Sequence, residues 1–320
     1  MSLELARQGN DARAEWNAAF VIGEICYALG DYEQAIARFA SNIEAESIDQ
    51  SRRRQPTGPA VPGVVNRRWL AMSLAEIGRF PEAIAAGTEA VESAEAASHP
   101  YSLINALVGL GFTLVRKNEV DRVIPLLERA YEVSGTLGFT MWDACAVPLG
   151  AAYGLAGRTA DAASLLTDPR IEEGYHHCGS VAESFLLCGR LDDAARWAER
   201  DLAHARESGS RAEEAWTLFV LGILASGGNR ADSEIARDHL RRALALAERG
   251  GMRPLVARIQ RALGELARRA GREEEAEAHL AVAATMFREM DVRAGDESEP
   301  ARALALRHEG DRGSMIRLDD

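Results

Sequence analysis

The sequence predicts an all-α protein, a right-handed α-solenoid of about seven helix-turn-helix repeats. Three observations lead to this prediction: the composition, a recurring phrase of small and apolar residues, and a glycine or asparagine that ends the first helix of most copies. Hydrophobic residues make up 47% of the 320-residue chain and aromatic residues only 6%. Alanine and leucine dominate, which favours closely packed helices over sheets. A repeat array can extend over such a length as one continuous stack.

The phrase consists of an apolar helix with a small residue at its centre, a turn, and a second helix with an alanine near its start. The clearest copy extends from Gly23 to Ile36, with its turn at Gly30. Glycine and asparagine adopt the left-handed conformation that ends a helix at little cost, so the second helix can fold back on the first. The expected turn residues are Gly30, Gly78, Asn118, Gly157, Gly189, a stretched turn at 227–229, and Gly271.

A small residue precedes each turn by seven positions, where a bulky side chain would hold the paired helices apart. These residues are Gly23, Ala71, Gly111, Gly150, Ala182, Gly222 and Gly264. Alanines five positions after most turns are expected to allow the same close approach from the second helix. The sequence therefore predicts pairs of antiparallel helices in close contact.

This pattern resembles the tetratricopeptide repeat family, in which a Gly or Ala, an aromatic residue, a turn Gly and an Ala recur at these relative places. The resemblance extends from about residue 12 to residue 290. The family period is about 34 residues, whereas the first five turn residues are 48, 40, 39 and 32 residues apart. We expect longer helices or inserted loops to absorb the difference.

Several phrases also look similar to the C-terminal repeat region of large bacterial signalling proteins that combine a nucleotide cyclase or kinase domain with a P-loop ATPase module. The phrases are Ala28 to Ile36, Arg68 to Ala71, His99 to Leu103 and Ala284 to Met290. This resemblance implies a regulatory or sensory tail. Since the chain has no GxxxxGK[ST] motif and no cyclase domain, we expect it to be the tail alone or a detached relative of it, with possible upstream cyclase, kinase or ATPase domains missing from this chain.

Two segments interrupt the helical pattern. Residues 49–63 contain three prolines and two glycines and are expected to form an irregular loop. This loop is either an insertion on the solenoid surface or a binding loop whose arginines, at 52–54, face an acidic partner. Residues 291–320 are expected to form a short helix and a flexible C-terminal tail. The predicted organisation is a repeat solenoid over 1–290 followed by this tail.

The charge and the apolar pattern exclude several classes of partner. The formal net charge of -12 works against binding to nucleic acid, whose phosphates require neutralising cations. No run of about 18 apolar residues is present to span a bilayer, and the amino terminus lacks the pattern of a signal peptide. Four scattered cysteines favour a reducing compartment. We expect a cytoplasmic protein with no nucleic acid and no membrane as partner.

The sequence contains no recognisable catalytic or cofactor motif. GxSxG, HExxH and CxxC spacings are absent. His176, His177 and Cys178, with Cys188 ten residues on, are the only cluster of potential metal ligands. Adjacent histidines on a helix point about 100 degrees apart, so both seldom reach one ion. We therefore expect no metal, no cofactor and no catalytic residue, and conclude that the chain is not an enzyme.

The first helix of each repeat is expected to line a concave groove. Counted from the turn residue, its inward positions hold polar and aromatic side chains, a mixture that suits an extended or helical peptide. The predicted binding residues are Asn17, Phe20, Glu24 and Tyr27 from the first repeat, Arg68 and Met72 from the second, and Asn105, Val108 and Phe112 from the third. For Phe20 and Phe112, packing between the helices is an equal alternative. Four arginines on the last repeat are interpreted as a solvated mixed face, with an anionic contact as the alternative: Arg258, Arg261, Arg268 and Arg269.

The sequence thus predicts a protein- or peptide-binding repeat scaffold, and the second resemblance implies a regulatory role in bacterial signalling. The main alternative is a small-ligand or peptide-pheromone sensor that closes around its ligand, which predicts a deep closed pocket instead of an open groove. An enzyme on a repeat scaffold is the third hypothesis. It predicts titratable groups that converge in one cavity with perturbed pKa values.

Overall fold

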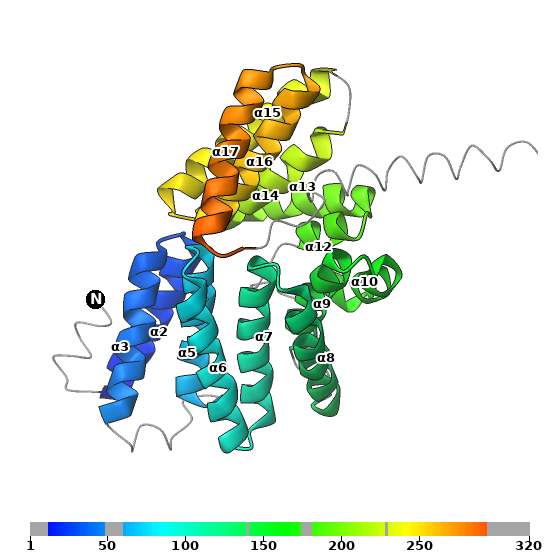
Figure 1. Cartoon of the computed structure of the whole chain (residues 1–320). Helices are drawn as coiled ribbons and strands as arrows, with labels where there is room; N and C mark the ends of the chain where they lie inside the picture. The colour runs from blue at the N-terminus through cyan, green and yellow to red at the C-terminus, as the bar shows by residue number, and fades with distance from the viewer. Residues whose placement is uncertain (1–11, 49–59, 139–140, 174–180, 228–229, 293–320) are drawn as a thin grey trace, which may run out of the picture.

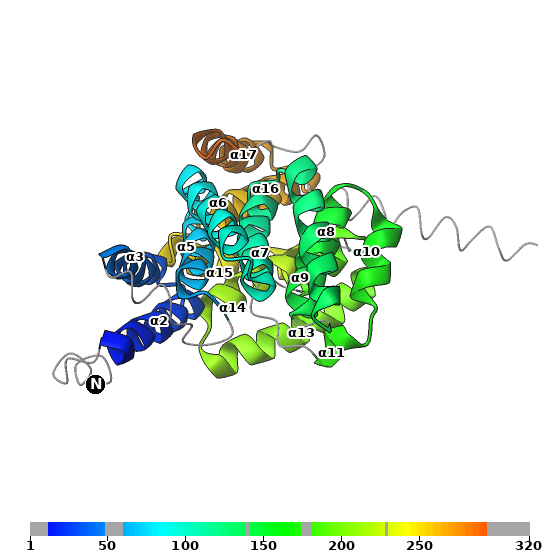
Figure 2. The ribbon, with the colours of Figure 1, turned by 90° about the horizontal axis from the view of Figure 1, so that it is seen from below.

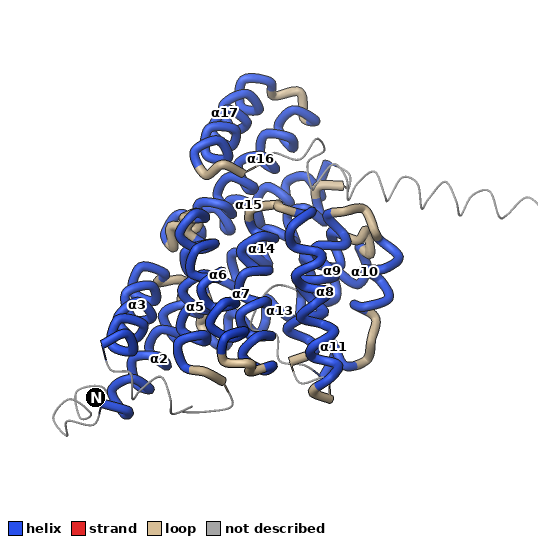
Figure 3. Tube along the Cα trace, turned by 60° about the horizontal axis from the view of Figure 1, so that its bottom comes forward, coloured by secondary structure: helices blue, strands red, loops and turns tan. Residues whose placement is uncertain are grey.

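The computed structural model of the protein describes residues 12–48, 60–138, 141–173, 181–227 and 230–292. Within these ranges every regular element is an α-helix and no strand is present (Figure 3). None of the described helices combines the length and the apolar character needed to cross a membrane. The predicted fold class, an α-solenoid, is confirmed.

The described helices follow one another as seven helical pairs. The pairs are α2 (Ala12–Ala28) with α3 (Tyr32–Ile48), α5 (Pro62–Glu76) with α6 (Phe80–Ala96), α7 (Pro100–Arg116) with α8 (Val120–Thr136), α9 (Trp142–Leu155) with α10 (Thr159–Leu166), α12 (Val181–Leu187) with α13 (Leu191–Ser208), α14 (Arg211–Ala225) with α15 (Arg230–Arg249), and α16 (Arg253–Arg269) with α17 (Glu273–Glu289). A short helix, α11 (Arg170–Glu173), follows α10. The two helices of each pair contact each other, and each pair contacts the next along the chain.

The expected turn residues have the backbone conformation that the sequence predicts. Their φ angles lie between 61° and 80°, in the left-handed region, at Gly30, Gly78, Asn118, Gly157, Gly189 and Gly271. At the first turn, the N–H of Gly30 donates to the carbonyl of Tyr27 at 2.9 Å and that of Asp31 to Cys26 at 2.8 Å. These bonds satisfy the last carbonyls of α2, which is how such a turn ends a helix. The stretched turn at 227–229 falls partly outside the described residues.

The small residues before the turns lie where the two helices of a pair touch. A Cβ atom on Gly23 would lie 2.7 Å from the ring of Phe39, and one on Gly111 would lie 2.4 Å from the Leu127 side chain. A larger side chain at either position would therefore force the facing side chain or its helix to shift. On the second helices, Ala35 and its counterparts in other pairs are fully buried. The predicted close approach of the paired helices is confirmed.

The irregular segment expected between the first two pairs, 49–63, ends earlier than predicted. Helix α5 begins at Pro62, so the last two residues of the segment 49–63 are helical rather than irregular. Proline is tolerated in the first turn of a helix because its missing N–H would have no intrahelical partner there. Residues 49–59, including the arginines at 52–54, and residues 293–320 of the predicted tail lie outside the described residues.

The stack of pairs curves back until its two ends meet. Figure 1 shows α2 to α9 side by side in the lower half of the molecule and α13 to α17 above them, and Figure 2 shows α14 to α16 behind α5 and α7. Helix α14 contacts α2, and α16 contacts α5. The Ser210 hydroxyl donates to the carbonyl of Ala28 at 2.8 Å, and Arg211 Nε donates to that of Leu29 at 3.0 Å. We call the contact formed by these four residues the seam.

Candidate ligand-binding cavity at the seam

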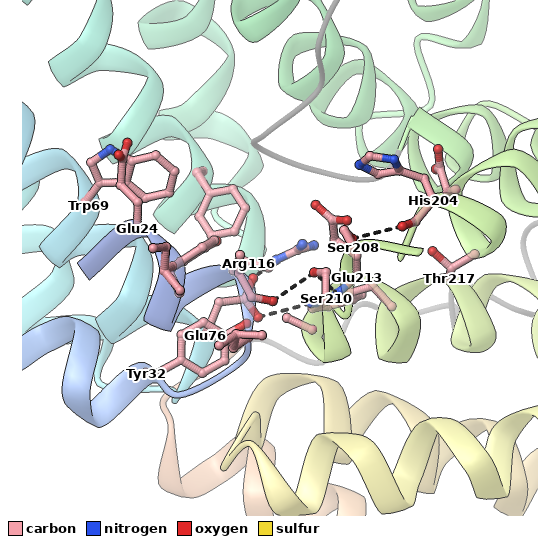
Figure 4. A pocket seen from close by; sticks show the side chains of 18 residues that line it. Glu24, Tyr32, Trp69, Glu76, Arg116, His204, Ser208, Ser210, Glu213 and Thr217 are labelled. Carbon is pink, nitrogen blue, oxygen red and sulfur yellow. Dashed lines mark hydrogen bonds and ion pairs between the residues drawn. The ribbon is translucent and has the colours of Figure 1, made fainter. Parts of the chain in front are cut away.

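A cavity of about 390 Å³ lies where the seam brings α2 and α14 together (Figure 4). Its walls come from α2 and the start of α3, from α5 and α7, and from the end of α13 and the start of α14. Segments about 180 residues apart in the sequence thus enclose one space. The cavity exists only because the solenoid closes on itself.

Aromatic side chains form much of the cavity wall. The ring of Tyr27 lies 5.1 Å from that of Trp69 and 5.3 Å from that of Tyr32, measured between centroids and in edge-on arrangements. One guanidinium group lies over two further rings of the wall, with its carbon 3.6 Å from the ring centroid of Trp216 and 4.8 Å from that of Phe112. Such rings supply large apolar areas with few rotatable bonds, which suits ligand binding.

That guanidinium belongs to Arg116, the centre of a buried group of charges. Its Nε lies 3.2 Å from Glu76 Oε1 and its Nη1 lies 2.8 Å from Glu183 Oε2. Arg258 Nη1 lies 2.8 Å from the other oxygen of Glu183, and Trp216 Nε1 donates to Glu76 Oε2 at 3.1 Å. We call the four charged residues the ionic cluster. It joins α5, α7, α12 and α16 at one point.

All four members of the ionic cluster are at most 8% exposed. Burial opposes the charge of Glu183, but Arg116 and Arg258 outweigh it and hold the pKa of this carboxyl below its usual value. Burial also opposes the charge of Arg116, yet Glu183 and Glu76 raise its pKa. For Glu76 burial wins, and it raises the pKa although Arg116 and Trp216 act in the opposite direction.

Two further carboxylates line the cavity outside the ionic cluster. Glu24 on α2 and Glu213 on α14 are both partly buried. Burial raises the pKa of Glu24, with Arg68 acting against it. Burial likewise raises the pKa of Glu213, with His204 and Ser210 acting against it. In the described part of the chain, neither carboxylate forms an ion pair.

Three of the nine predicted binding residues line this cavity: Glu24, Tyr27 and Phe112. Two others contact each other, since Arg68 Nη1 donates to Asn105 Oδ1 at 2.7 Å and both side chains are buried.

The remaining four predicted residues lie apart from the cavity. Asn17 is exposed on α2. Phe20 packs between the rings of Trp16 and Phe39, with centroids 5.7 and 5.9 Å away. Met72 and Val108 are fully buried in the core rather than on an open groove surface. The physical reason is that each first helix is flanked by the neighbouring pairs, so a position that faces inward is accessible only where a cavity opens beside it.

Sequence reasoning missed most of the ionic cluster. It did not single out Glu76, Arg116 or Glu183, and its interpretation of Arg258 as a solvated residue is wrong, since this side chain is buried against Glu183. One signal was available. Glu76 and Arg116 each stand two positions before the turn of consecutive repeats, where a charge at the end of an apolar helix is unusual.

No group of three or more His, Cys, Asp or Glu side chains within the described ranges is arranged to hold a metal ion. His176, His177 and Cys178 lie outside these ranges. Cys188 is buried at the end of α12, and burial raises the pKa of its thiol. This thiol is consequently a poor nucleophile.

Comparisons with known proteins identify the architecture. No family model matches the sequence, and a comparison with curated proteins found no match. The fold is similar to that of the Rap conjugation gene regulator of the plasmid pLS20 in complex with the Phr* peptide, with a TM-score of 0.65 and 13% identity over 89% of this chain and 77% of that chain. It is also similar to the apo form of RapI, with a TM-score of 0.56 and 11% identity over 87% of this chain and 99% of that chain. The protein is a tetratricopeptide-like helical repeat protein, and at these identities the likeness concerns the fold alone.

Proposed function

We propose that this protein is a regulatory receptor that binds a short peptide in the seam cavity. The observation that carries the proposal is the cavity itself, walled by aromatic side chains from both ends of the solenoid. Its volume of about 390 Å³ lies within the usual range of ligand sites. The Rap regulator of similar fold was solved in complex with a peptide, which makes a peptide the first ligand class to test.

An apolar stripe beside the cavity favours a peptide over a smaller molecule. Val21 and Ile25 on α2 and Leu29 directly after it stand four positions apart and are 49%, 52% and 37% exposed. They account for three of the five large apolar side chains that are exposed in the described part of the chain. Ile25 and Leu29 also line the cavity. A ligand longer than the cavity would cover this stripe with its own apolar side chains.

The position of the cavity gives the ligand a way to regulate. A bound peptide would contact both α2 and α14 and would therefore bind the closed solenoid better than an open one. Such a difference in affinity shifts the population toward the closed form. The change in curvature could then be passed to a partner protein. In the signalling context that the sequence resemblance implies, that partner would be a cyclase, kinase or ATPase module.

A small-molecule sensor is the second candidate function. It is favoured by the seam, because the seam encloses the cavity. A long helical peptide would instead need an open groove. The two candidates differ in the ligand that the same cavity would select.

The test is capture of peptides from a random pentapeptide library by the immobilised protein, followed by sequencing of the bound fraction. Ala28→Trp is the variant, because Ala28 is exposed and lines the cavity, so an indole there fills the mouth without disturbing the core. We expect enriched peptides to bind the variant at least about tenfold more weakly, a loss of about 1.4 kcal/mol. Ala96→Trp, at an exposed position on α6, is the control and should bind normally.

Two results would count against peptide binding. If the captured peptides bind Ala28→Trp as well as the wild type, the cavity is not their site. If no peptide is enriched but a pool of cellular metabolites raises the melting temperature of the wild type and not of Ala28→Trp, the small-molecule alternative is correct.

A further inference from the structure

We infer that the protein forms a homodimer in which the outer face of α17 packs antiparallel on the α17 of a second copy. Helix α17 is the last described helix of the stack and packs on α16 with its buried face. Figure 2 shows α17 at the outer edge of the molecule. No residue of α17 lines the seam cavity, so the inference does not depend on the proposed function.

The middle of the outer face of α17 carries no charge. A terminal repeat normally needs a polar outer face to keep the array soluble. The exposed residues between positions 278 and 285 are instead all uncharged: Ala278, Ala281, Val282, Ala284 and Thr285. Val282 is 44% exposed and is one of the five large apolar side chains exposed among the described residues. A partner can cover this part of the face without desolvating a charge.

Opposite charges stand at the two ends of this uncharged centre. Glu274 precedes it and Arg288 follows it, and both side chains are exposed. Within the described ranges, neither belongs to an ion pair. Each is seven positions from Ala281, which is about two helical turns, so the three residues lie on one face of the helix. Such a face is complementary to a second copy of itself in the reverse direction.

An antiparallel pair of α17 helices uses this complementarity. With a two-fold axis at Ala281, Glu274 of each copy lies opposite Arg288 of the other, and Ala278 lies opposite Ala284. The small side chain at the axis allows the two helices to approach closely. A parallel pair would place each charge opposite the same charge, which costs free energy. The charges therefore select the antiparallel arrangement and a second copy of this chain as the partner.

The size of the face determines how strong the dimer is. A helix of 17 residues is about 25 Å long and, with its side chains, about 10 Å wide. One face of it covers less than the roughly 800 Å² per partner of a standard interface. We therefore expect a dimer with a Kd of about 10 to 100 μM. The two-fold axis repeats the contact between Glu274 and Arg288 at both ends, so each substitution changes two ion pairs.

Sedimentation equilibrium of the full chain with charge reversals tests the interface. Glu274→Arg or Arg288→Glu places like charges at both ends of the pair and is expected to weaken dimerisation at least about fivefold. The double variant, Glu274→Arg/Arg288→Glu, restores opposite charges and should return the Kd to within about twofold of the wild type. The control Glu92→Arg makes the same change in net charge at an exposed position on α6 and should leave the Kd unchanged.

Ala281→Cys gives a second measurement that does not depend on charge. In the dimer the two new thiols face each other across the two-fold axis, so oxidation by oxygen with copper as catalyst should join them in a disulfide. The control is Thr88→Cys, at an exposed position on α6. It should give no more linked dimer than the wild type, whose own cysteines set the background.

Four results would overturn the inference. One is a monomer at every concentration up to about 1 mM. The second is a dimer whose Kd is indifferent to both single charge reversals, and the third is equal cross-linking of Ala281→Cys and Thr88→Cys. The fourth is a monomer in which the thiol of Ala281→Cys resists alkylation, which would show that the chain's own residues after 292 cover this face.

Discussion

At the scale of single residues, the ionic cluster is the most unusual feature of the molecule. Glu183 receives Arg116 on one oxygen and Arg258 on the other, each at 2.8 Å, and all three side chains are buried. Removing charges from water is costly, and the cost is offset only while every member keeps its partner. Removal of one carboxylate therefore leaves buried charge that nothing compensates.

Replacement of Glu183 by glutamine tests this dependence. Glu183→Gln keeps the volume but leaves two buried arginines without their shared counter-ion, so we expect the free energy of unfolding to fall by about 3 to 5 kcal/mol. Urea denaturation followed by circular dichroism measures the change. The control Glu199→Gln alters an exposed side chain on α13 and should stay within about 0.5 kcal/mol of the wild type. A loss no larger than that of the control would mean that the cluster does not stabilise the fold.

The same carboxyl predicts a dependence on pH. Its pKa in the folded protein lies below the ordinary value of 4.5, so the stabilisation from Glu183 is complete above pH 4.5 and is lost as the pH falls through the folded value. Burial raises the pKa of Glu24 and Glu213, so their contributions to the pH dependence of stability have the opposite sign. Both residues are present in the wild type and in Glu183→Gln, so their contributions cancel in the comparison of the two proteins. We expect the difference in unfolding free energy between the two proteins to shrink as the pH is lowered below 4.5. A difference that stays constant in urea titrations across this range would contradict the assignment.

At the scale of helices, the closest approaches occur between pairs as well as within them. A Cβ atom on Gly154 of α9 would lie 2.9 Å from the carbonyl carbon of Leu187 at the end of α12. On Gly111, by contrast, it would meet the end of the Leu127 side chain, which can move. Contact with a backbone atom cannot be relieved by a change of rotamer, so Gly154 fixes how two consecutive pairs stack.

Gly154→Ala is therefore expected to destabilise the protein although alanine is the better helix former. The overpacking should cost about 1 to 3 kcal/mol, against the roughly 1 kcal/mol that alanine gains over glycine within a helix. Thermal denaturation measures the net loss. Ser164→Ala, at an exposed position on α10, is the control and should leave the melting temperature nearly unchanged. An increase in stability in Gly154→Ala would show that α9 and α12 can move apart freely.

At the scale of the whole molecule, the seam adds contacts between repeats that are not neighbours in the sequence. In an open solenoid each repeat contacts only its neighbours, and the terminal repeats open most easily. Here the first pair also contacts the start of α14, through the bonds from Ser210 and Arg211 to the carbonyls of Ala28 and Leu29. The first pair should therefore be protected by contacts with a part of the chain that is remote in sequence.

Ser210→Ala/Arg211→Ala removes both side-chain bonds of the seam. We expect hydrogen exchange in α2 and α3 to become faster in this variant, while exchange in α7 and α8 stays unchanged. Arg206→Ala/Ser208→Ala is the matched control, because these α13 side chains bond within their own pair or to Glu214 and not to α2. Equal exchange rates in α2 for the wild type and the seam variant would show that the seam does not hold the first pair closed.

The sequence by itself determined the helical pairs. The turn at Gly30 and the small residue at Gly23 are local requirements, since a left-handed backbone and a close helix contact each restrict the residue at one position. Such restrictions recur with every repeat, so the fold class and the turns could be predicted. The expected groove positions were less informative: three of these residues line the cavity, whereas Met72 and Val108 are fully buried.

Only the tertiary structure decided where the ends of the solenoid meet. The bond from Trp216 to Glu76 joins residues 140 positions apart, and the bond from Ser210 to Ala28 joins residues 182 positions apart. The curvature that brings them together is the sum of small rotations between successive pairs, each set by side-chain packing that no short motif encodes. The seam, the ionic cluster and the cavity all depend on that curvature. The sequence therefore predicted the repeats but not the place where distant repeats form the cavity.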